Sequence, residues 1–558
     1  MKQKALYVLV LLAVIISACG TKPIEAPLAP AAEVTEAPAS GGGDVTVRIG
    51  WIGNPDTLNP AYAFLTESYA IFDLVYSTLT KEAVDGSYVG DLAKEWSVAD
   101  DGLTWTYHLK DGIKWHNGEP FTAEQMAWAI NAVMLDPDGW ATTANYTAGF
   151  SEVTAPDDAT VVIVTEYPIA NMDYRVSWLF AVYPPDFEGF TTPEDLQNFS
   201  NSEPIGTGPF VLKTFDKDAG VILLDANKDY FGGSPKIDSV TFQLFDNTDA
   251  MIQALKVGDI DMVNSVPASA FDSVKGFDNV KTIAVDSRYF NELIINTVDP
   301  NNDPAPTGNP ALADPAVRLA IAHSINKQDI VDIVLQGLGT PGDSIVSPAT
   351  GGGFWYSPNI KDIPFDIAAA NSVLDQAGYV LGSDGVRAKG DLRLEFRLQF
   401  PSDSSTYPRV ADMLTDWFNQ AGMKANPEAV DPDSLTAATT GVGDYDLVLW
   451  GWGPDPDPDF ILSVMTTDQF VAGGWRDSGY QNPEYDQMYL DQQKIVDKAE
   501  RQKVIWKMQE MVFEDRPYIV LHYEQILQAY RSDRFTNYIE SALGIESGQS
   551  LSQVESVK

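Results

Sequence analysis

The stretch from Leu92 to Met126 is the part of this chain whose local structure the sequence constrains most closely. Apolar and polar side chains alternate from Leu103 to Leu109, and this period of two is typical of a half-buried β-strand. An Asp-Gly pair stands on each side of the strand, and such pairs favour tight hairpin turns. Thr122 and Gln125 have the spacing of a capping box, so a helix is predicted from there to about Met134. The stretch therefore predicts a scaffold unit rather than a chemical site.

The same stretch carries the signature of one large family. The residues that fall on it are Leu92, Trp96, Gly102, Gly112, Trp115, His116, Gly118, Pro120, Thr122 and Ala123. It resembles the solute-binding proteins of peptide-type ABC importers, the dipeptide- and oligopeptide-binding group known as bacterial solute-binding protein family 5. Further blocks follow in the family's order at Gly206–Phe210, Gly258–Asp261 and Tyr480–Asp486. The resemblance extends from about Val45 to Arg531.

The resemblance implies an α/β fold with two lobes. This is the periplasmic-binding-protein fold of class II type, in the large peptide-binder variant that has an extra subdomain in lobe I. The implied domains are lobe I at 45–297 and 517–558, with the subdomain at about 80–206, and lobe II at 298–516. The ligand of such a protein lies between the lobes, and closure about two hinge strands buries it. We expect these hinge strands near Asn296 and Pro517.

The N-terminus predicts export and lipid anchoring. An uncharged apolar run from Ala5 to about Ala18 follows two lysines and has the length of a signal-peptide core. It ends in a sequence that resembles the bacterial lipobox, in which Cys19 becomes the lipidated first residue; an ordinary signal peptide with a chance cysteine is the alternative. Residues 1–18 are therefore expected to be a lipoprotein signal peptide. Residues 19–44 are rich in Pro, Ala and Gly and are expected to be a disordered tether.

Charge and cysteine content exclude several classes of function. The formal net charge is -43. A chain this acidic is a poor candidate for binding nucleic acid, and we expect contact with the membrane only through the lipid. The acidity is interpreted as a solubility device, with a saline or acidic habitat as the alternative. Cys19 is the only cysteine, so the folded body has no disulfide and no cysteine nucleophile. The body is expected to be a monomer.

No motif in the sequence indicates an enzyme or a metal site. Residues 337–342 match G-x-G-x-x-G literally, but they follow a predicted helix and continue as a loop, which is the wrong context for a dinucleotide. The alternating carboxylates of residues 455–459 lack the glycine and glutamate of a calcium loop, and their prolines stiffen the segment. His108 and His116 are interpreted as structural or surface residues. We expect no catalytic residue, no metal and no cofactor, and an extracytoplasmic hydrolase is the remote alternative.

The best candidate for binding is the segment from Trp450 to Asp455. In peptide-binding relatives, an aspartate three residues after a tryptophan pairs with the α-ammonium of the ligand, and Asp455 falls on that position. The resemblance also implies that the backbone of Gly451 and Gly453 pairs with an extended peptide as an added strand would. Trp452 and Trp450 are candidate ligand platforms. The alternatives are a helix cap or solvated turn for Asp455 and core positions for the two tryptophans.

The sequence does not determine the class of the ligand. Some oligopeptide binders carry an arginine three residues before the tryptophan, where this chain has Leu449. The family also includes binders of oligosaccharides and nickel chelates, and aromatic side chains such as Trp452 suit sugars. Residues Leu65, Thr66 and Glu67 align with a first-lobe loop that touches ligand.

We therefore expect a lipid-anchored, extracytoplasmic binding protein that delivers peptides to a membrane permease served by separate ATPase subunits. A carrier of cello-, xylo- or manno-oligosaccharides is the alternative.

Overall fold

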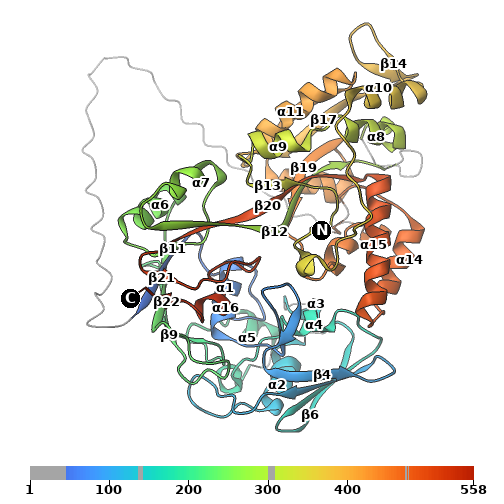
Figure 1. Cartoon of the computed structure of the whole chain (residues 1–558). Helices are drawn as coiled ribbons and strands as arrows, with labels where there is room; N and C mark the ends of the chain where they lie inside the picture. Colours follow the sequence, from blue (N-terminus) through green and yellow to red (C-terminus); the bar gives the residue numbers. More distant parts are fainter. Residues whose placement is uncertain are drawn as a thin grey trace, which may run out of the picture. The chain divides into compact units, whose positions relative to one another are not determined.

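One mixed sheet of eleven strands organises the body of the protein (Figure 1). Its strand order is β18 (Lys424–Val430), β17 (Glu395–Pro401), β19 (Leu447–Trp452), β12 (Val280–Ile295), β20 (Tyr518–Arg531), β11 (Met262–Val263), β1 (Thr46–Trp51), β10 (Ser239–Leu244), β9 (Val221–Ala226) and β8 (Phe210–Asp216), with β13 (Gly339–Pro341) also paired to β20. The computed structural model describes residues 45–135, 142–190, 192–298, 308–469, 471, 474–475 and 477–557. The predicted signal peptide, Cys19 and the tether lie outside the described residues.

Smaller sheets and helices surround this sheet. The smaller sheets are β4 (Ala93–Val98), β5 (Thr104–Leu109), β7 (Thr160–Thr165) and β6 (Phe150–Asp157); β2 (Thr80–Glu82) and β3 (Tyr88–Gly90); β14 (Val380–Leu381), β15 (Arg387–Lys389) and β16 (Leu392–Arg393); and β21 (Phe535–Thr536) and β22 (Glu555–Ser556). The α-helices are α1 (Thr66–Val75), α2 (Ala123–Ala129), α3 (Ala144–Thr147), α4 (Met172–Val176), α5 (Pro193–Gln197), α6 (Thr248–Val257), α7 (Ala268–Lys275), α8 (Pro315–His323), α9 (Lys327–Ile333), α10 (Ile367–Gln376), α11 (Tyr407–Gln420), α12 (Pro432–Thr436), α13 (Asp459–Ser463), α14 (Pro483–Gln492), α15 (Lys498–Asp515) and α16 (Gly548–Leu551). Shorter 3-10 or π turns are η1 (Ile130–Met134), η2 (Pro184–Phe187), η3 (Pro310–Ala313), η4 (Thr350–Gly353), η5 (Ala437–Val442) and η6 (Thr467–Gln469). Among the described residues, no helix is long and apolar enough to cross a membrane.

The long strands β12 and β20 lie side by side and antiparallel, and they connect two separate hydrophobic cores (Figure 1). Ile283, in the first half of β12, packs in the core that contains β1, β5 and α2. Leu293, in the second half, packs in a different core with α8, α11 and β17. The pairing register shifts between Asp286 and Phe290, where the change of core occurs. The division into lobes stays a proposal. The packing favours a hinge at the irregular stretch 286–290 and the facing part of β20, and not at the predicted positions near Asn296 and Pro517.

The stretch from Leu92 to Met126 forms the predicted scaffold. β4 and β5 pair antiparallel across the first Asp-Gly turn, and Trp105, Tyr107 and Leu109 are buried. Thr122 and Gln125 form the capping box of α2, and η1 extends the helical segment to Met134. These predictions are confirmed.

One local prediction was wrong. The second Asp-Gly pair, Asp111-Gly112, lies in a loop and not in a hairpin, because β5 pairs with β4 and β7 instead.

His116 has a structural role. Its Nδ1 accepts a hydrogen bond from the Gly206 N–H (3.2 Å), and its Nε2 lies 3.1 Å from the Gly208 carbonyl. Burial lowers the pKa of His116 to about 4, so the ring is neutral at physiological pH. The histidine therefore ties the loop after β5 to the turn before β8.

Candidate functional site

A cavity of about 860 Å³ brings together four parts of the chain that are distant in sequence. They are α1 with the β2–β3 hairpin, the segment after α4, the loop after β19, and the C-terminal segment around α16. Arg288, in the irregular part of β12, also lines it. Of the predicted site residues, Thr66, Gly453 and Asp455 line this cavity.

Asp455 follows β19 between two buried prolines and is partly exposed to the cavity. The hydroxyl of Tyr174 lies near its carboxylate and acts to lower its pKa. Burial raises the pKa of Asp455, while the positive charge of Arg288 acts in the opposite direction. No ion pair to Asp455 occurs among the described residues. This carboxylate is therefore largely withdrawn from water without a cation beside it, which is costly unless a ligand supplies one.

The two aspartates that follow Asp455 hold the loop in place. Asp457 forms a buried bidentate ion pair with Arg501 of α15, with N–O distances of 2.5 and 2.7 Å. Gln492 of α14 donates to Asp459 (2.6 Å) and accepts from Arg501 (2.9 Å). These carboxylates therefore serve as structural anchors that preorganise Asp455. The sequence did not reveal Arg501 as the partner, because it lies more than forty residues away.

Gly451 and Gly453 face Tyr289. A Cβ atom on Gly451 would lie 2.7 Å from the Tyr289 hydroxyl oxygen, and one on Gly453 would lie 3.2 Å from its ring. β19 pairs with β12 along its whole length but with β17 only at Leu447 and Val448. Among the described strands, the second backbone edge of β19 is therefore open from Leu449 onward. Both glycines remain candidates for backbone pairing with a ligand. The close packing of Tyr289 is a second reason why these positions hold glycine.

Trp450 and Trp452 do not line the cavity. Both are partly buried against the core that contains Phe290 and Tyr518. The Trp452 Nε1 donates to the Tyr518 hydroxyl (3.3 Å), and its ring contacts Phe460 and Trp475 edge-on. The packing of Trp452 is that of a core residue at the rim of the site, and its role as a ligand platform stays a prediction.

Of the three predicted residues at the start of α1, Leu65, Thr66 and Glu67, only Thr66 lines the cavity. Leu65 is 46% exposed, and the Glu67 carboxylate lies against Gly53. Asp56 holds the loop before α1, because its carboxylate accepts from the Phe64 N–H (2.9 Å) and the Ser68 hydroxyl (2.6 Å).

Sequence reasoning missed the aromatic wall of the cavity and the residue Arg288. Tyr69 and Trp178 line the cavity and contact each other edge-on at 5.2 Å, and Tyr146 stacks on Trp178 at an interplanar angle of 5°. Arg288 makes a 2.7 Å ion pair with Glu82 of β2. No local pattern could have grouped these residues, because the fold brings them together from separate elements.

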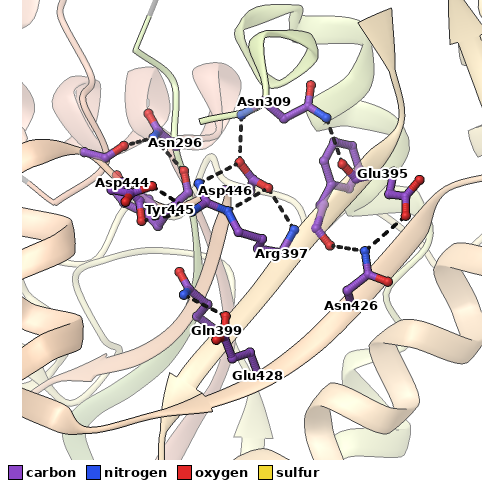
Figure 2. A network of polar contacts seen from close by, with 12 residues as sticks. Asn296, Asn309, Glu395, Arg397, Gln399, Asn426, Glu428, Asp444, Tyr445 and Asp446 are labelled. Carbon is purple, nitrogen blue, oxygen red and sulfur yellow. Dashed lines mark hydrogen bonds and ion pairs between the residues drawn. The ribbon is translucent and has the colours of Figure 1, made fainter. Parts of the chain in front are cut away.

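A second hollow lies beside β16, β17 and the residue before β19, and hydrogen bonds and ion pairs connect its polar side chains (Figure 2). Asp446, just before β19, accepts from the backbone N–H groups of Asn309 (2.7 Å) and Arg397 (2.8 Å). Glu395 pairs with Lys424 (2.6 Å) and Arg393 (2.9 Å). Because these acids are paired with protein cations or N–H groups, we assign the hollow to structure.

Comparison with known proteins shows the family to which this chain belongs. The model of "Bacterial extracellular solute-binding proteins, family 5 Middle" matches residues 87–472, which is more than half of the chain. This chain belongs to family 5 of the bacterial extracellular solute-binding proteins. Family 5 proteins are the non-enzymatic substrate-binding components of ABC importers, and their two-lobed α/β fold is the one predicted.

Individual relatives span almost the whole chain. The oligopeptide-binding protein AppA of Bacillus subtilis (strain 168) is 27% identical over 526 residues, covering 93% of this chain and 92% of AppA. The nickel-binding periplasmic protein of Escherichia coli (strain K12) is 26% identical over 403 residues, covering 70% and 72%. Among solved structures, the ABC transporter substrate-binding protein CtaP of Listeria monocytogenes superposes with a TM-score of 0.80 at 24% identity, covering 92% of this chain and 100% of CtaP.

Proposed function

We propose that this protein captures peptides in the cavity beside Asp455 and delivers them to the permease of an ABC importer. The observation that carries the proposal is the Asp455 carboxylate, which is open to the cavity and has no ion pair among the described residues. The α-ammonium group of a peptide would supply the missing cation. The open edge of β19 supports an extended backbone as ligand, because main-chain pairing accepts any side chain. The similarity to an oligopeptide-binding protein of Bacillus subtilis supports the same ligand class.

The test is a thermodynamic cycle on Asp455→Asn, which removes the charge and keeps the shape. With a tripeptide that binds the wild type, we expect the substitution to cost about 2–5 kcal/mol of binding free energy in titration calorimetry, because it removes one partner of a buried ion pair. N-acetylation of the peptide removes the other partner and should cost a similar amount. Acetylation should then cost the Asn variant little more. Unchanged affinity of the variant for the free peptide would rule out the pairing.

An oligosaccharide is the second candidate, and the aromatic wall favours it. Rings of Tyr69, Trp178 and Phe180 line the cavity, and flat aromatic faces suit the apolar faces of sugars. A thermal-shift screen separates the two candidates, because a ligand that binds only the folded state raises the melting temperature. Stabilisation by cello-, xylo- or manno-oligosaccharides, with none by peptides, would replace the peptide proposal.

We further propose that the protein is a monomer held at the outer face of the membrane by lipid on Cys19, with residues 19–44 as the tether. The lipobox-like sequence supports this anchor. Cys19→Ser should move the protein from the membrane fraction to the soluble extracytoplasmic fraction, with the ligand affinity unchanged. Retention of this variant in the membrane would contradict the anchor.

A further inference from the structure

The cavity is strongly acidic. Among the described residues that line it, the ionisable groups other than tyrosines are Asp73, Lys81, Glu82, Asp91, Arg288, Asp455 and Glu546. Five are acids and two are bases. Because charges in a recess are screened less than charges on an open surface, this imbalance acts on a bound ligand.

Both bases are already neutralised by protein partners. Lys81 makes a 3.0 Å ion pair with Asp91, and Arg288 makes its ion pair with Glu82. A carboxylate of the ligand could reach either base only by displacing an acid, which would leave that acid unpaired in turn. The cavity therefore presents no unengaged base to an anionic ligand among the described residues.

Three acids remain without an ion pair in the described part of the chain. Asp73 accepts from the Gly548 N–H (2.6 Å), and Glu546 accepts from the side-chain amide of Gln528 (2.5 Å). The Tyr174 hydroxyl lies near Asp455. Each of the three lines the cavity and has accessible surface there. Burial raises the pKa of all three, in the case of Glu546 to about 7, although the charge of Lys81 at Asp73 and the charge of Arg288 at Asp455 act in the opposite direction.

Two hydroxyl groups at the same cavity also lack hydrogen-bond partners. The Ser77 side chain is only 3% exposed, and its oxygen has no partner in the protein. The buried Tyr88 hydroxyl also has no hydrogen-bond partner in the protein. Buried polar atoms in proteins are nearly always bonded, so these two hydroxyl groups are unusual among the residues that line the cavity. Ser77 stands close in sequence to Asp73 and Lys81, whereas the Tyr88 hydroxyl is within reach of the charges of Asp455 and Arg288.

We infer that the ligand carries more positive than negative charge, with one cationic group at Asp455 and a second in the compartment formed by Asp73 and Glu546. For a peptide, the second group is a lysine or arginine side chain. This inference rests on the proposed function, because it takes the ammonium end of a peptide to lie at Asp455. It adds that basic peptides are the preferred cargo and that Glu546, in the C-terminal segment that lines the cavity, contributes to this preference.

The test compares tripeptides by titration calorimetry. Trialanine is measured against the three peptides with one lysine and the three with one glutamate. At least one lysine peptide should bind about tenfold or more tightly than trialanine, which corresponds to about 1.4 kcal/mol, and the glutamate peptides should bind most weakly. Equal affinities of the alanine and lysine peptides would overturn the inference and leave the proposed function intact. If no peptide of any charge binds, the proposed function itself fails.

Matched variants locate the effect. Glu546→Gln should reduce the lysine-to-alanine preference to within a few-fold. Glu203→Gln removes the same charge from an exposed acid that does not line the cavity, and the preference should persist. An equal loss of the lysine preference in both variants would contradict the role of the compartment. It would indicate that the overall charge of the protein causes the preference. If Glu546→Gln does not fold, Asp73→Asn makes the same comparison.

Discussion

At the scale of single residues, Asp477 shows the cost of burying an acid. Its carboxylate accepts from the Tyr518 hydroxyl, and burial raises its pKa to about 7. The neighbouring Glu292 of β12 is fully buried, and neither of its carboxylate oxygens has a partner. Burial and the charge of Asp477 raise the pKa of Glu292 well above its usual range. Tyr518 links Asp477 to Trp452, and neither acid has an ion pair among the described residues.

Asp477 should make stability fall as the pH rises. In the unfolded chain its pKa is about 4, so between about pH 4 and pH 7 the unfolded state binds fewer protons than the folded state. The stabilising effect is therefore fully present below about pH 4 and lost by about pH 7. Asp477→Asn should unfold at higher urea concentration than the wild type at pH 8, by roughly 3–4 kcal/mol at about 1.4 kcal/mol per pKa unit, and the gain should vanish near pH 4. A gain of equal size at both pH values would contradict this account.

At the scale of elements, β19 and the irregular part of β12 are matched in shape. Tyr289 stands where the register of β12 and β20 shifts, and its ring covers the two glycines at the end of β19. The glycines and the shift therefore belong to one arrangement, in which the strand that leads to Asp455 is fixed by a side chain from the strand beside it.

Gly451→Ala should destabilise the protein, because the new methyl group would stand 2.7 Å from the Tyr289 hydroxyl oxygen. We expect a cost of about 1–3 kcal/mol in urea unfolding. Gly453→Ala, with 3.2 Å to the ring, should cost less. In a Tyr289→Ala background the penalty at Gly451 should largely disappear, since neighbouring substitutions are not additive. A penalty that persists in that background would show that another contact requires the glycine.

The sequence predicted elements well where one local pattern determines them. Alternation predicted β5, and the capping box predicted α2, because both depend on residues a few positions apart. Residue Asp455 could be placed at the cavity only through the family resemblance. The partners that define the site, such as Arg501, Tyr289 and the segment around α16, were not predicted, because their proximity to β19 depends on long-range packing. The true extents of β12 and β20 were missed because each strand passes through two cores with different burial patterns.

At the scale of the whole molecule, charge is the dominant feature. A net charge of -43 on a chain with 36 basic residues implies self-repulsion in the folded state. It also attracts cationic ligands to the surface, which agrees with the acidic cavity.

The melting temperature should therefore rise with added NaCl. Most of the rise is expected between about 0.01 and 0.15 M, where the Debye length falls from about 30 Å to about 8 Å. Differential scanning calorimetry at fixed pH measures it. A rise that begins only near molar salt would indicate salting-out by the solvent rather than screening of repulsion.

The position of β20 in the main sheet has a consequence for export. β11 pairs with β1 on one side and with β20 on the other, so the sheet of the first lobe is incomplete until residues close to the C-terminus arrive. Such distant pairings form late, because a long loop must close first. The pairing of this sheet therefore cannot be completed until the last segment of the polypeptide has been synthesised. Late completion of the sheet is compatible with a family of extracellular proteins, whose chains reach their location before they fold.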